Sequence, residues 1–212
     1  MEINILEQKY KEKQLKPRHI SDLERKKIAE LEYDYWDNPK FPGYQGYKYD
    51  GRWMSAASKL KDYYGLNKLS TVLDIGCGKG FLLHDIHKVS GCEVKGLDKS
   101  QYAIDSSPSL VRDKIIHGDS KDLPFLDNEF DLVLCFSMLY ALDYEDVVDS
   151  IKEIERVGKN KFIMVHTYTN DKERDNLEKY DATRKTMECI DGWKELFKKV
   201  GYTGDYWWTI YL

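Results

Sequence analysis

The stretch that decides the fold is Val72-Leu73-Asp74-Ile75-Gly76-Cys77-Gly78-Lys79-Gly80, which continues an apolar run that starts at Thr71. A short apolar run that leads into closely spaced glycines predicts a strand, a tight turn and then a helix, here one that begins near Phe81. Glycines let the backbone turn sharply and approach a ligand without intervening side chains. The stretch therefore predicts a ligand-binding strand–loop–helix unit.

Outward from this unit, short apolar runs alternate with segments that favour helices. The runs lie at Thr71–Ile75, Glu93–Leu97, Lys114–His117, Phe130–Phe136 and Lys161–Thr167. Runs that are apolar on both faces are typical of buried parallel strands. The clearest helix covers 144–157, with Asp143 as its candidate cap and Gly158 after its end. This order predicts an α/β fold with a doubly wound, mostly parallel sheet and helices on both faces.

The first 65 residues are predicted to form an N-terminal helical extension with an aromatic lid, ahead of a ligand-binding domain over 66–212. Ser21 and Glu24 have the spacing of a capping box, which favours a helix through about Tyr33. Residues 34–51 combine prolines and glycines with many aromatic side chains, a mixture typical of an ordered loop rather than a linker. A helix is expected next, from Arg52 to Tyr64.

Composition narrows the functional classes. The 212 residues include 33 Lys and Arg and 37 Asp and Glu, a formal net charge of −4, which argues against tight nucleic-acid binding. The basic residues between Lys9 and Lys27 are interspersed with acidic ones and favour a solvated helix surface. The four cysteines are scattered without metal-ligand spacing, so we expect reduced thiols and no metal site. No apolar run is long enough for a membrane span, and a cytoplasmic location is expected.

Charge and spacing discriminate among the nucleotide-type ligands that use a glycine-rich turn. A phosphate at this loop would be repelled by Asp74, which ends the strand two residues before Gly76. The pattern Gly76-x-Gly78-x-Gly80 is also neither the dinucleotide form nor a P-loop. S-adenosylmethionine has no phosphate and carries an α-ammonium, which a carboxylate can hold.

Two more acidic residues follow strands. Asp98 ends the second strand at the spacing where a carboxylate meets ribose hydroxyls. Asp119 follows the third strand, placed to accept a hydrogen bond from an adenine amino group, and the backbone of Ser120 is placed to meet the ring. Each has a simpler alternative, as a surface or turn aspartate.

With these elements in this order, residues 66–167 resemble class I S-adenosylmethionine-dependent methyltransferases, and most closely the branch that modifies small molecules such as quinone rings. The resemblance implies S-adenosylmethionine as cofactor and a small-molecule methyl acceptor as partner. It places Asp74, Gly76 and Gly78 at the methionine portion, Asp98 at the ribose, and Asp119 and Ser120 at the adenine. Cys77 and Lys99 are further candidates for cofactor binding. Phe136 and Ser137, at the end of the fourth strand, would line the place where donor meets acceptor.

The chain departs from the family pattern twice. Val157-Gly158-Lys159-Asn160-Lys161 replaces the usual Lys-Pro-Gly-Gly-like turn before the fifth strand. The family sheet normally ends in an antiparallel hairpin, whereas one strand, Asp205 to Tyr211, follows the last helix of about Asp191 to Val200. We expect that strand to run antiparallel. Its partner is either in residues 182–190, or absent from a shorter sheet, or in a longer protein.

The predicted activity is methyl transfer to an oxygen or nitrogen atom of a small molecule. His166, near the end of the fifth strand, is the first candidate for a general base, and Tyr140 is the second. The aromatic loop from Phe41 to Trp53 is the candidate lid, with Tyr44 and Tyr47 over the donor. Arg52 is the candidate partner of the methionine carboxylate. A packed or solvent-facing His166, and an N-terminal clasp that only buries aromatic rings, remain the structural alternatives.

Two other functional classes use similar residues. An aminopropyltransferase binds a decarboxylated donor on a similar fold and has no need of a carboxylate partner such as Arg52. A non-catalytic subunit that binds the cofactor and scaffolds a partner enzyme keeps Asp74, Asp98 and Asp119 without turnover. A homodimer is compatible with the sequence, and neither nucleic acid nor membrane is an expected partner.

Overall fold

The computed structural model describes residues 1–5 and 20–211, and within them six strands form one parallel sheet. The strand order is β3-β2-β1-β4-β5-β6. Strands β2 and β3 therefore extend the sheet on one side of β1, and β4, β5 and β6 extend it on the other. The strands are β1 Thr71–Ile75, β2 Glu93–Asp98, β3 Ile115–His117, β4 Phe130–Phe136, β5 Gly158–Thr167 and β6 Asp205–Ile210. The predicted doubly wound α/β fold is confirmed.

Helices connect and cover these strands. They are α1 Asp22–Ala29, α2 Tyr33–Trp36, α3 Met54–Tyr64, α4 Phe81–Ser90, α5 Gln101–Asp105, α6 Ser109–Arg112, the 3-10 turn η1 Leu139–Ala141, α7 Tyr144–Val157, α8 Asp171–Tyr180 and α9 Ile190–Val200. The bounds of α7 are those predicted from its apolar spacing. The 118–129 connection is irregular instead of helical.

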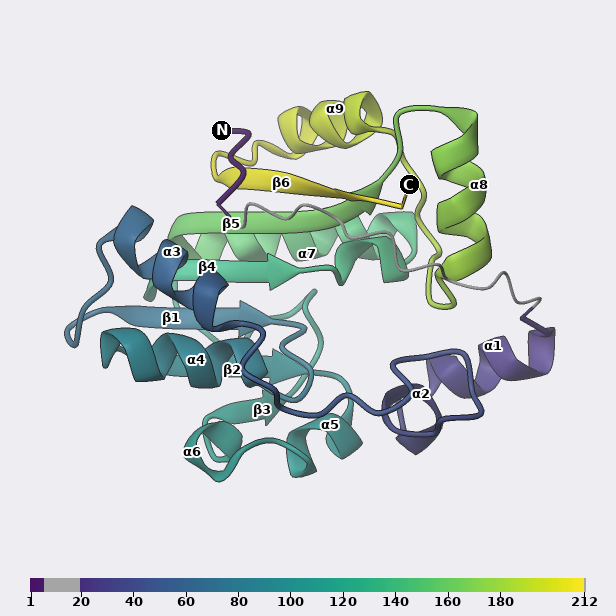
Figure 1. Ribbon diagram of the computed structural model, residues 1–212. Helices are drawn as coiled ribbons and strands as arrows, with labels where there is room; N and C mark the ends of the chain where they lie inside the picture. The colour runs from purple at the N-terminus through teal and green to yellow at the C-terminus, as the bar shows by residue number, and fades with distance from the viewer. Residues whose placement is uncertain (6–19, 212) are drawn as a thin grey trace.

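Side chains that alternate along the strands build a core on each face of the sheet. Val72 of β1 packs with helices α3 and α4, through Leu60 and Leu83 among others. Its neighbour Leu73 belongs to the opposite core, with Ile151 of α7 and other side chains from α7 and α9. A strand buried on both faces must be apolar at successive positions, which is why the sequence pattern was readable. Figure 1 shows α3 and α4 on one side of the sheet and α7 on the other.

The last strand corrects one prediction. β6 runs parallel to β5, with Val165 opposite Trp208, and residues 182–190 form no strand. Helices α8 and α9 connect β5 to β6 in the sequence and return the chain to the end of the sheet where β5 began. Strand β6 therefore points the same way as β5. On the outer side of β6, Glu2 forms a parallel bridge with Tyr206.

The N-terminal region is less regular than predicted. The capping box of Ser21 and Glu24 is present, but α1 ends at Ala29 because the chain turns at Leu31, whose φ is 54°. Gly65, at φ 66°, ends α3 as predicted. Part of the basic stretch between Lys9 and Lys27 lies outside the described residues. In Figure 1, α1 and α2 lie beyond the carboxyl ends of the strands.

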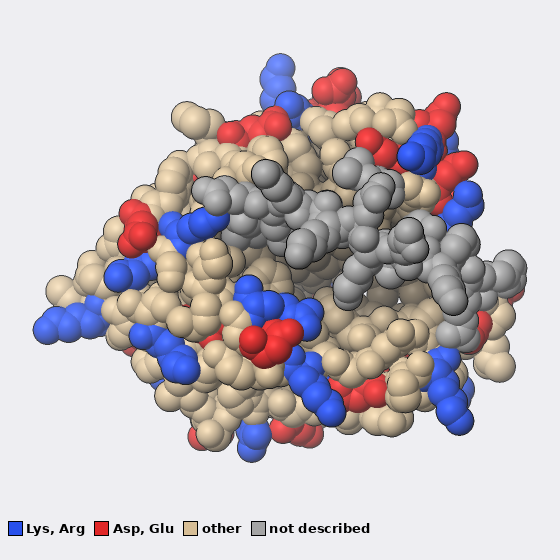
Figure 2. Space-filling model, viewed as in Figure 1, with Lys and Arg blue, Asp and Glu red and all other residues tan. Residues whose placement is uncertain are grey.

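Two surface properties follow from the described residues. None of their helices has the length and apolar character that crossing a bilayer requires. On the face that Figure 2 shows, basic and acidic side chains are interspersed instead of being gathered by sign.

Candidate active site

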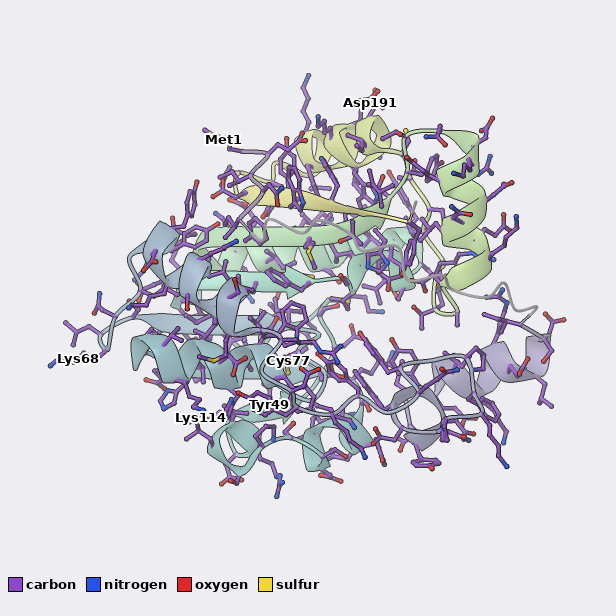
Figure 3. All side chains as sticks on the ribbon, viewed as in Figure 1. Met1, Tyr49, Lys68, Cys77, Lys114 and Asp191 are labelled. Atoms are coloured by element: carbon purple, nitrogen blue, oxygen red, sulfur yellow. The ribbon has the colours of Figure 1, made fainter. Side chains whose placement is uncertain are left out.

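The glycine loop between β1 and α4 holds three residues in the left-handed region, Gly76 at φ 71°, Gly78 at 55° and Gly80 at 66°. A Cβ added at Gly76 would lie 2.7 Å from the Met138 side chain, and one at Gly78 would lie 2.7 Å from the Trp36 ring. Backbone conformation and space therefore both require glycine. Figure 3 labels Cys77, which lies on this loop at the carboxyl end of β1.

Asp74 lies in β1 next to this loop, at the carboxyl end of the strand, and is buried. Its Oδ1 atom is buried and has no hydrogen-bond partner within the part of the chain that the structure describes. Burial, followed by the negative charge of Asp98, raises the pKa of Asp74 well above its ordinary value. A buried carboxylate oxygen without a donor is unfavourable unless a ligand supplies one. The position suits a cationic donor such as an α-ammonium.

Asp98, at the end of β2, is held by backbone donors. Gly78 N donates to its Oδ2 at 2.6 Å and Ser100 N to its Oδ1 at 2.8 Å. Burial raises its pKa, and these backbone hydrogen bonds oppose that effect. Each carboxylate oxygen accepts more than one hydrogen bond, so the fixed side chain keeps capacity for two hydroxyl groups.

The loop after β3 holds the two residues predicted at the adenine. Asp119 lies 3.8 Å from Lys99 Nζ and 3.9 Å from Lys121 Nζ, on a partly exposed surface. The Ser120 hydroxyl is buried and lies 2.7 Å from the Ser150 hydroxyl of α7. The Ser120 side chain therefore anchors the loop, and the predicted contact of its backbone with an adenine ring stays a prediction.

Cys77 and the residues at the end of β4 are the remaining predicted site residues on this side of the sheet. Burial, with the charges of Asp98 and Asp74, raises the pKa of the Cys77 thiol, so the thiol stays neutral and serves as packing. The Phe136 ring lies 6.2 Å from Trp53 and 5.4 Å from Phe162. Ser137 has a φ of 56° and donates its N–H to Met164 O at 2.8 Å, so the chain turns sharply there.

The aromatic segment packs against the glycine loop. Trp36 stacks on Tyr44, with centroids 5.1 Å apart and planes 5° apart, and its Nε1 donates to Ser100 Oγ at 3.0 Å. Tyr47 lies 4.8 Å from Phe81, the first residue of α4. The lid predicted at Phe41–Trp53 stays a prediction; in the structure Trp36, which lies outside that range, packs with its Tyr44. The many aromatic residues of this segment could be recognised in the sequence, but the contact between Trp36 and Gly78 could not.

Arg52 lies at the end of the aromatic segment. Its guanidinium forms a bidentate pair with Asp50, at 2.9 and 2.7 Å, and its Cζ lies 5.6 Å from the Tyr47 ring centroid. Half of its side chain is exposed. Its predicted role at a carboxylate stays a prediction.

A second cluster surrounds His166 at the carboxyl end of β5. Tyr140 stacks on the imidazole, with centroids 4.3 Å apart and planes 14° apart. Asp181 Oδ2 lies 3.2 Å from His166 Nδ1, and Tyr211 Oη lies 3.3 Å from the same nitrogen. The structure thus brings the two predicted candidates together. It adds Asp181 and Tyr211, which no local pattern in the sequence indicated.

His84 and His87, on α4, have structural partners. His84 Nδ1 lies 3.0 Å from Asp85 Oδ1, and His87 Nδ1 lies 2.8 Å from Cys92 O. Over residues 1–5 and 20–211, no group of three His, Cys, Asp or Glu side chains is arranged to hold a metal ion.

Comparison with known proteins agrees with this fold. Residues 73–165 match the family described as a methyltransferase domain. A crystal structure of a SAM-dependent methyltransferase from Archaeoglobus fulgidus superposes with a TM-score of 0.58 and 21% identity, covering 75% of this chain and 71% of that one. The fold is that of class I, Rossmann-like S-adenosylmethionine-dependent methyltransferases. The match over residues 73–165, which is less than half of the chain, implies S-adenosylmethionine as the cofactor.

Curated relatives share part of the chain. A sterol 24-C-methyltransferase from Neurospora crassa is 30% identical over 136 residues, 60% of this chain and 36% of that protein. A demethylmenaquinone methyltransferase from Staphylococcus aureus is 35% identical over 107 residues, 47% of this chain and 43% of that protein. The matched region is therefore less than half of the length of either relative.

Proposed function

We propose that this protein transfers a methyl group from S-adenosylmethionine to an oxygen or nitrogen atom of a small-molecule acceptor. The observation that carries the proposal is the pair Asp74 and Asp98, two buried carboxylates at the carboxyl ends of neighbouring strands. Between them lies the glycine loop, on which the Met138 and Trp36 side chains pack. Such a site suits a cationic, phosphate-free nucleoside.

Different residues of the chain bind different parts of the cofactor. Asp74 Oδ1 accepts a hydrogen bond from the α-ammonium, and Gly76, Cys77 and Gly78 lie along the methionine portion. Asp98 accepts from the ribose hydroxyls beside Lys99, and Asp119 with the Ser120 backbone meets the adenine. Bound there, the cofactor supplies a methyl group that is already activated by its attachment to a sulfonium sulfur.

The acceptor side belongs to different elements. Phe136 and Ser137 line the place of transfer, and His166 is the general base, with Tyr140 packed on it. The N-terminal extension over 1–65 carries the lid at Phe41–Trp53, in which Tyr44 and Tyr47 cover the donor and exclude water. Residues 66–212 form the catalytic domain. Alignment of the two reactants in such a site contributes about 7–11 kcal/mol to lowering the barrier. The two curated relatives, named for a sterol and a menaquinone precursor, support a small-molecule acceptor.

The first prediction tests the ribose assignment. Asp98→Ala should weaken S-adenosylhomocysteine binding about tenfold or more, because it removes one or two charged hydrogen bonds of about 1.5–3 kcal/mol each. Isothermal titration calorimetry measures this, with Asp113→Ala as a matched control. Asp113 is exposed and precedes β3, at the amino ends of the strands, whereas Asp98 lies at their carboxyl ends. Equal affinity in the two variants would contradict the assignment.

The reaction is tested by incubating metabolite pools with methyl-labelled donor and identifying the labelled product. A product that carries an aminopropyl group from a decarboxylated donor would instead indicate the aminopropyltransferase alternative. Tight cofactor binding without any labelled product would indicate a scaffold subunit.

A further inference from the structure

We propose that Asp181 is a positioning residue that fixes the tautomer of His166, and that the group methylated here is a hydroxyl. The inference rests on the proposed function and deepens it, because it assigns the acceptor chemistry of the same site. It comes from a contact between β5 and the segment that follows α8.

Asp181 is itself held rigidly. Its Oδ1 accepts hydrogen bonds from the backbone N–H and the hydroxyl of Thr183, at 2.9 and 2.8 Å. Its Oδ2 faces His166 Nδ1 at 3.2 Å. Only 6% of Asp181 and 8% of His166 is exposed, so water does not compete strongly for this contact. Both carboxylate oxygens are engaged, and the imidazole has a fixed partner.

The protonation of Asp181 determines the tautomer. Burial acts to raise its pKa, but the hydrogen bond and charge of His166, together with the Thr183 hydrogen bonds, outweigh burial and leave the pKa below its ordinary value. An ionised carboxylate only accepts hydrogen bonds. His166 Nδ1 therefore carries the proton, and Nε2 is the basic nitrogen. Among the described residues, no hydrogen bond reaches Nε2.

The other groups near the pair are chiefly tyrosines from several elements. Tyr140 of η1 stacks on the imidazole, and Tyr211, which follows β6, approaches its edge at 5.2 Å. The charge of Asp181 contributes, after burial and Tyr44, to the raised pKa of Tyr35 of α2, so the lid also faces this carboxylate. Two cations reach this segment: Arg184 donates to the Asp181 carbonyl at 2.7 Å, and Arg25 of α1 donates to the Ala182 carbonyl at 3.3 Å. Burial raises the pKa of the Tyr140 and Tyr35 phenols and keeps them neutral, so His166 and Asp181 are the pair placed to transfer a proton.

A buried base of this kind favours a hydroxyl acceptor. A neutral amine attacks a methyl group with its own lone pair and loses its proton afterwards, whereas a neutral hydroxyl is a weak nucleophile until its proton is removed. In the proposed step the acceptor oxygen bonds to the methyl carbon while the carbon–sulfur bond breaks and its electron pair stays on sulfur. The hydroxyl proton moves to His166 Nε2, and Asp181 stabilises the resulting imidazolium.

Nitrogen-15 NMR of the histidine side chains tests the positioning role without turnover. His166→Gln assigns the resonance among the five histidines. The wild-type spectrum should show the Nδ1–H tautomer, and Asp181→Asn should shift the population towards Nε2–H, because an amide can donate to Nδ1. Asp171→Asn, an exposed residue at the start of α8, is the matched control and should leave the signal unchanged. The same tautomer in Asp181→Asn as in the wild type would overturn the positioning role.

Kinetics supply the second readout. Asp181→Asn should lower kcat about 100-fold while changing S-adenosylhomocysteine affinity less than twofold, and it should move the acidic limb of the pH–rate profile to lower pH. Thr183→Ala, which keeps the carboxylate, should give a smaller loss and covers the case in which Asp181→Asn does not fold. An unchanged pH–rate profile would contradict the proposal.

Product analysis decides the acceptor class. A labelled methyl ether supports the hydroxyl, and a labelled N-methyl or C-methyl product overturns it while leaving methyl transfer itself established. Loss of S-adenosylhomocysteine binding in the wild-type protein would instead remove the proposed function, and the NMR result on His166 would stand independently of it.

Discussion

At the scale of single residues, Asp74 shows a conflict between stability and function. Its buried Oδ1 has no partner among the described residues, and burial with the charge of Asp98 raises its pKa. The folded protein therefore binds more protons than the unfolded chain at pH values between the ordinary carboxyl pKa and the raised one. Stability that is present below this range is lost as the pH rises through it.

Asp74→Asn removes that titration. The variant should have a Tm at neutral pH at least as high as the wild type, and its Tm should fall less steeply as the pH rises from the ordinary carboxyl pKa. The same change should weaken S-adenosylhomocysteine binding, because an amide does not neutralise an ammonium. Calorimetric melts over a pH series and binding titrations measure the two effects. A lower Tm with unchanged affinity would mean that Asp74 is structural only.

Single residues could be predicted where the sequence around them has a recognisable pattern. Asp74 and Asp98 could be predicted because each ends an apolar strand, and the carboxyl ends of parallel strands meet at one edge. Asp181 could not, because it reaches His166 from an irregular segment 15 residues away and no periodic pattern marks that contact. The positions of Asp74 and Asp98 at one end of the sheet could therefore be predicted from sequence, whereas the contacts of His166 could not.

At the scale of elements, the aromatic segment and the glycine loop form one unit. Gly78 takes a φ of 55°, and a Cβ there would lie 2.7 Å from the Trp36 ring. Gly78→Ala should therefore combine a backbone cost of about 1–2 kcal/mol with a steric cost from the indole. Trp36→Ala relieves only the steric part.

A double-mutant cycle separates the two parts. Gly78→Ala should lower the unfolding free energy less in the Trp36→Ala background than in the wild type, by more than the ~0.5 kcal/mol expected for independent sites. Denaturant unfolding gives the four free energies. Strict additivity would show that the indole does not restrict the loop in solution.

The elements also show why local patterns succeed and fail. β1, β4 and α7 have the bounds predicted from their apolar spacing, because burial acts within each segment. The end of α1 at Ala29 could not be predicted, since the turn at Leu31 depends on how α2 packs. The expected antiparallel direction of β6 came from a family pattern, and the two intervening helices reverse it.

At the scale of the whole molecule, the start of the described chain covers the far edge of the sheet. Ile3 donates its N–H to Tyr206 O at 3.0 Å, and Tyr206 N donates to Met1 O at 3.0 Å. Ile3 and Ile5 pack into the core on the face of α3 and α4. Figure 3 shows Met1 beside β6. An uncovered strand edge is a template for pairing with another chain, so this short segment does the work of a further strand.

Ile3→Pro tests that role, because proline lacks the N–H that bonds Tyr206 O. The loss should be ~1–2 kcal/mol, which for a chain of this size lowers the Tm by about 2–8 °C, and the exposed edge should increase association measured by light scattering. Asn4→Pro is the matched control, since within residues 1–5 and 20–211 the Asn4 N–H makes no hydrogen bond. If both variants melt and scatter like the wild type, the segment is not needed to close the sheet. In that case the exposed character of β6 must be limited by its own side chains, of which Trp208 is buried and Tyr206 is partly buried.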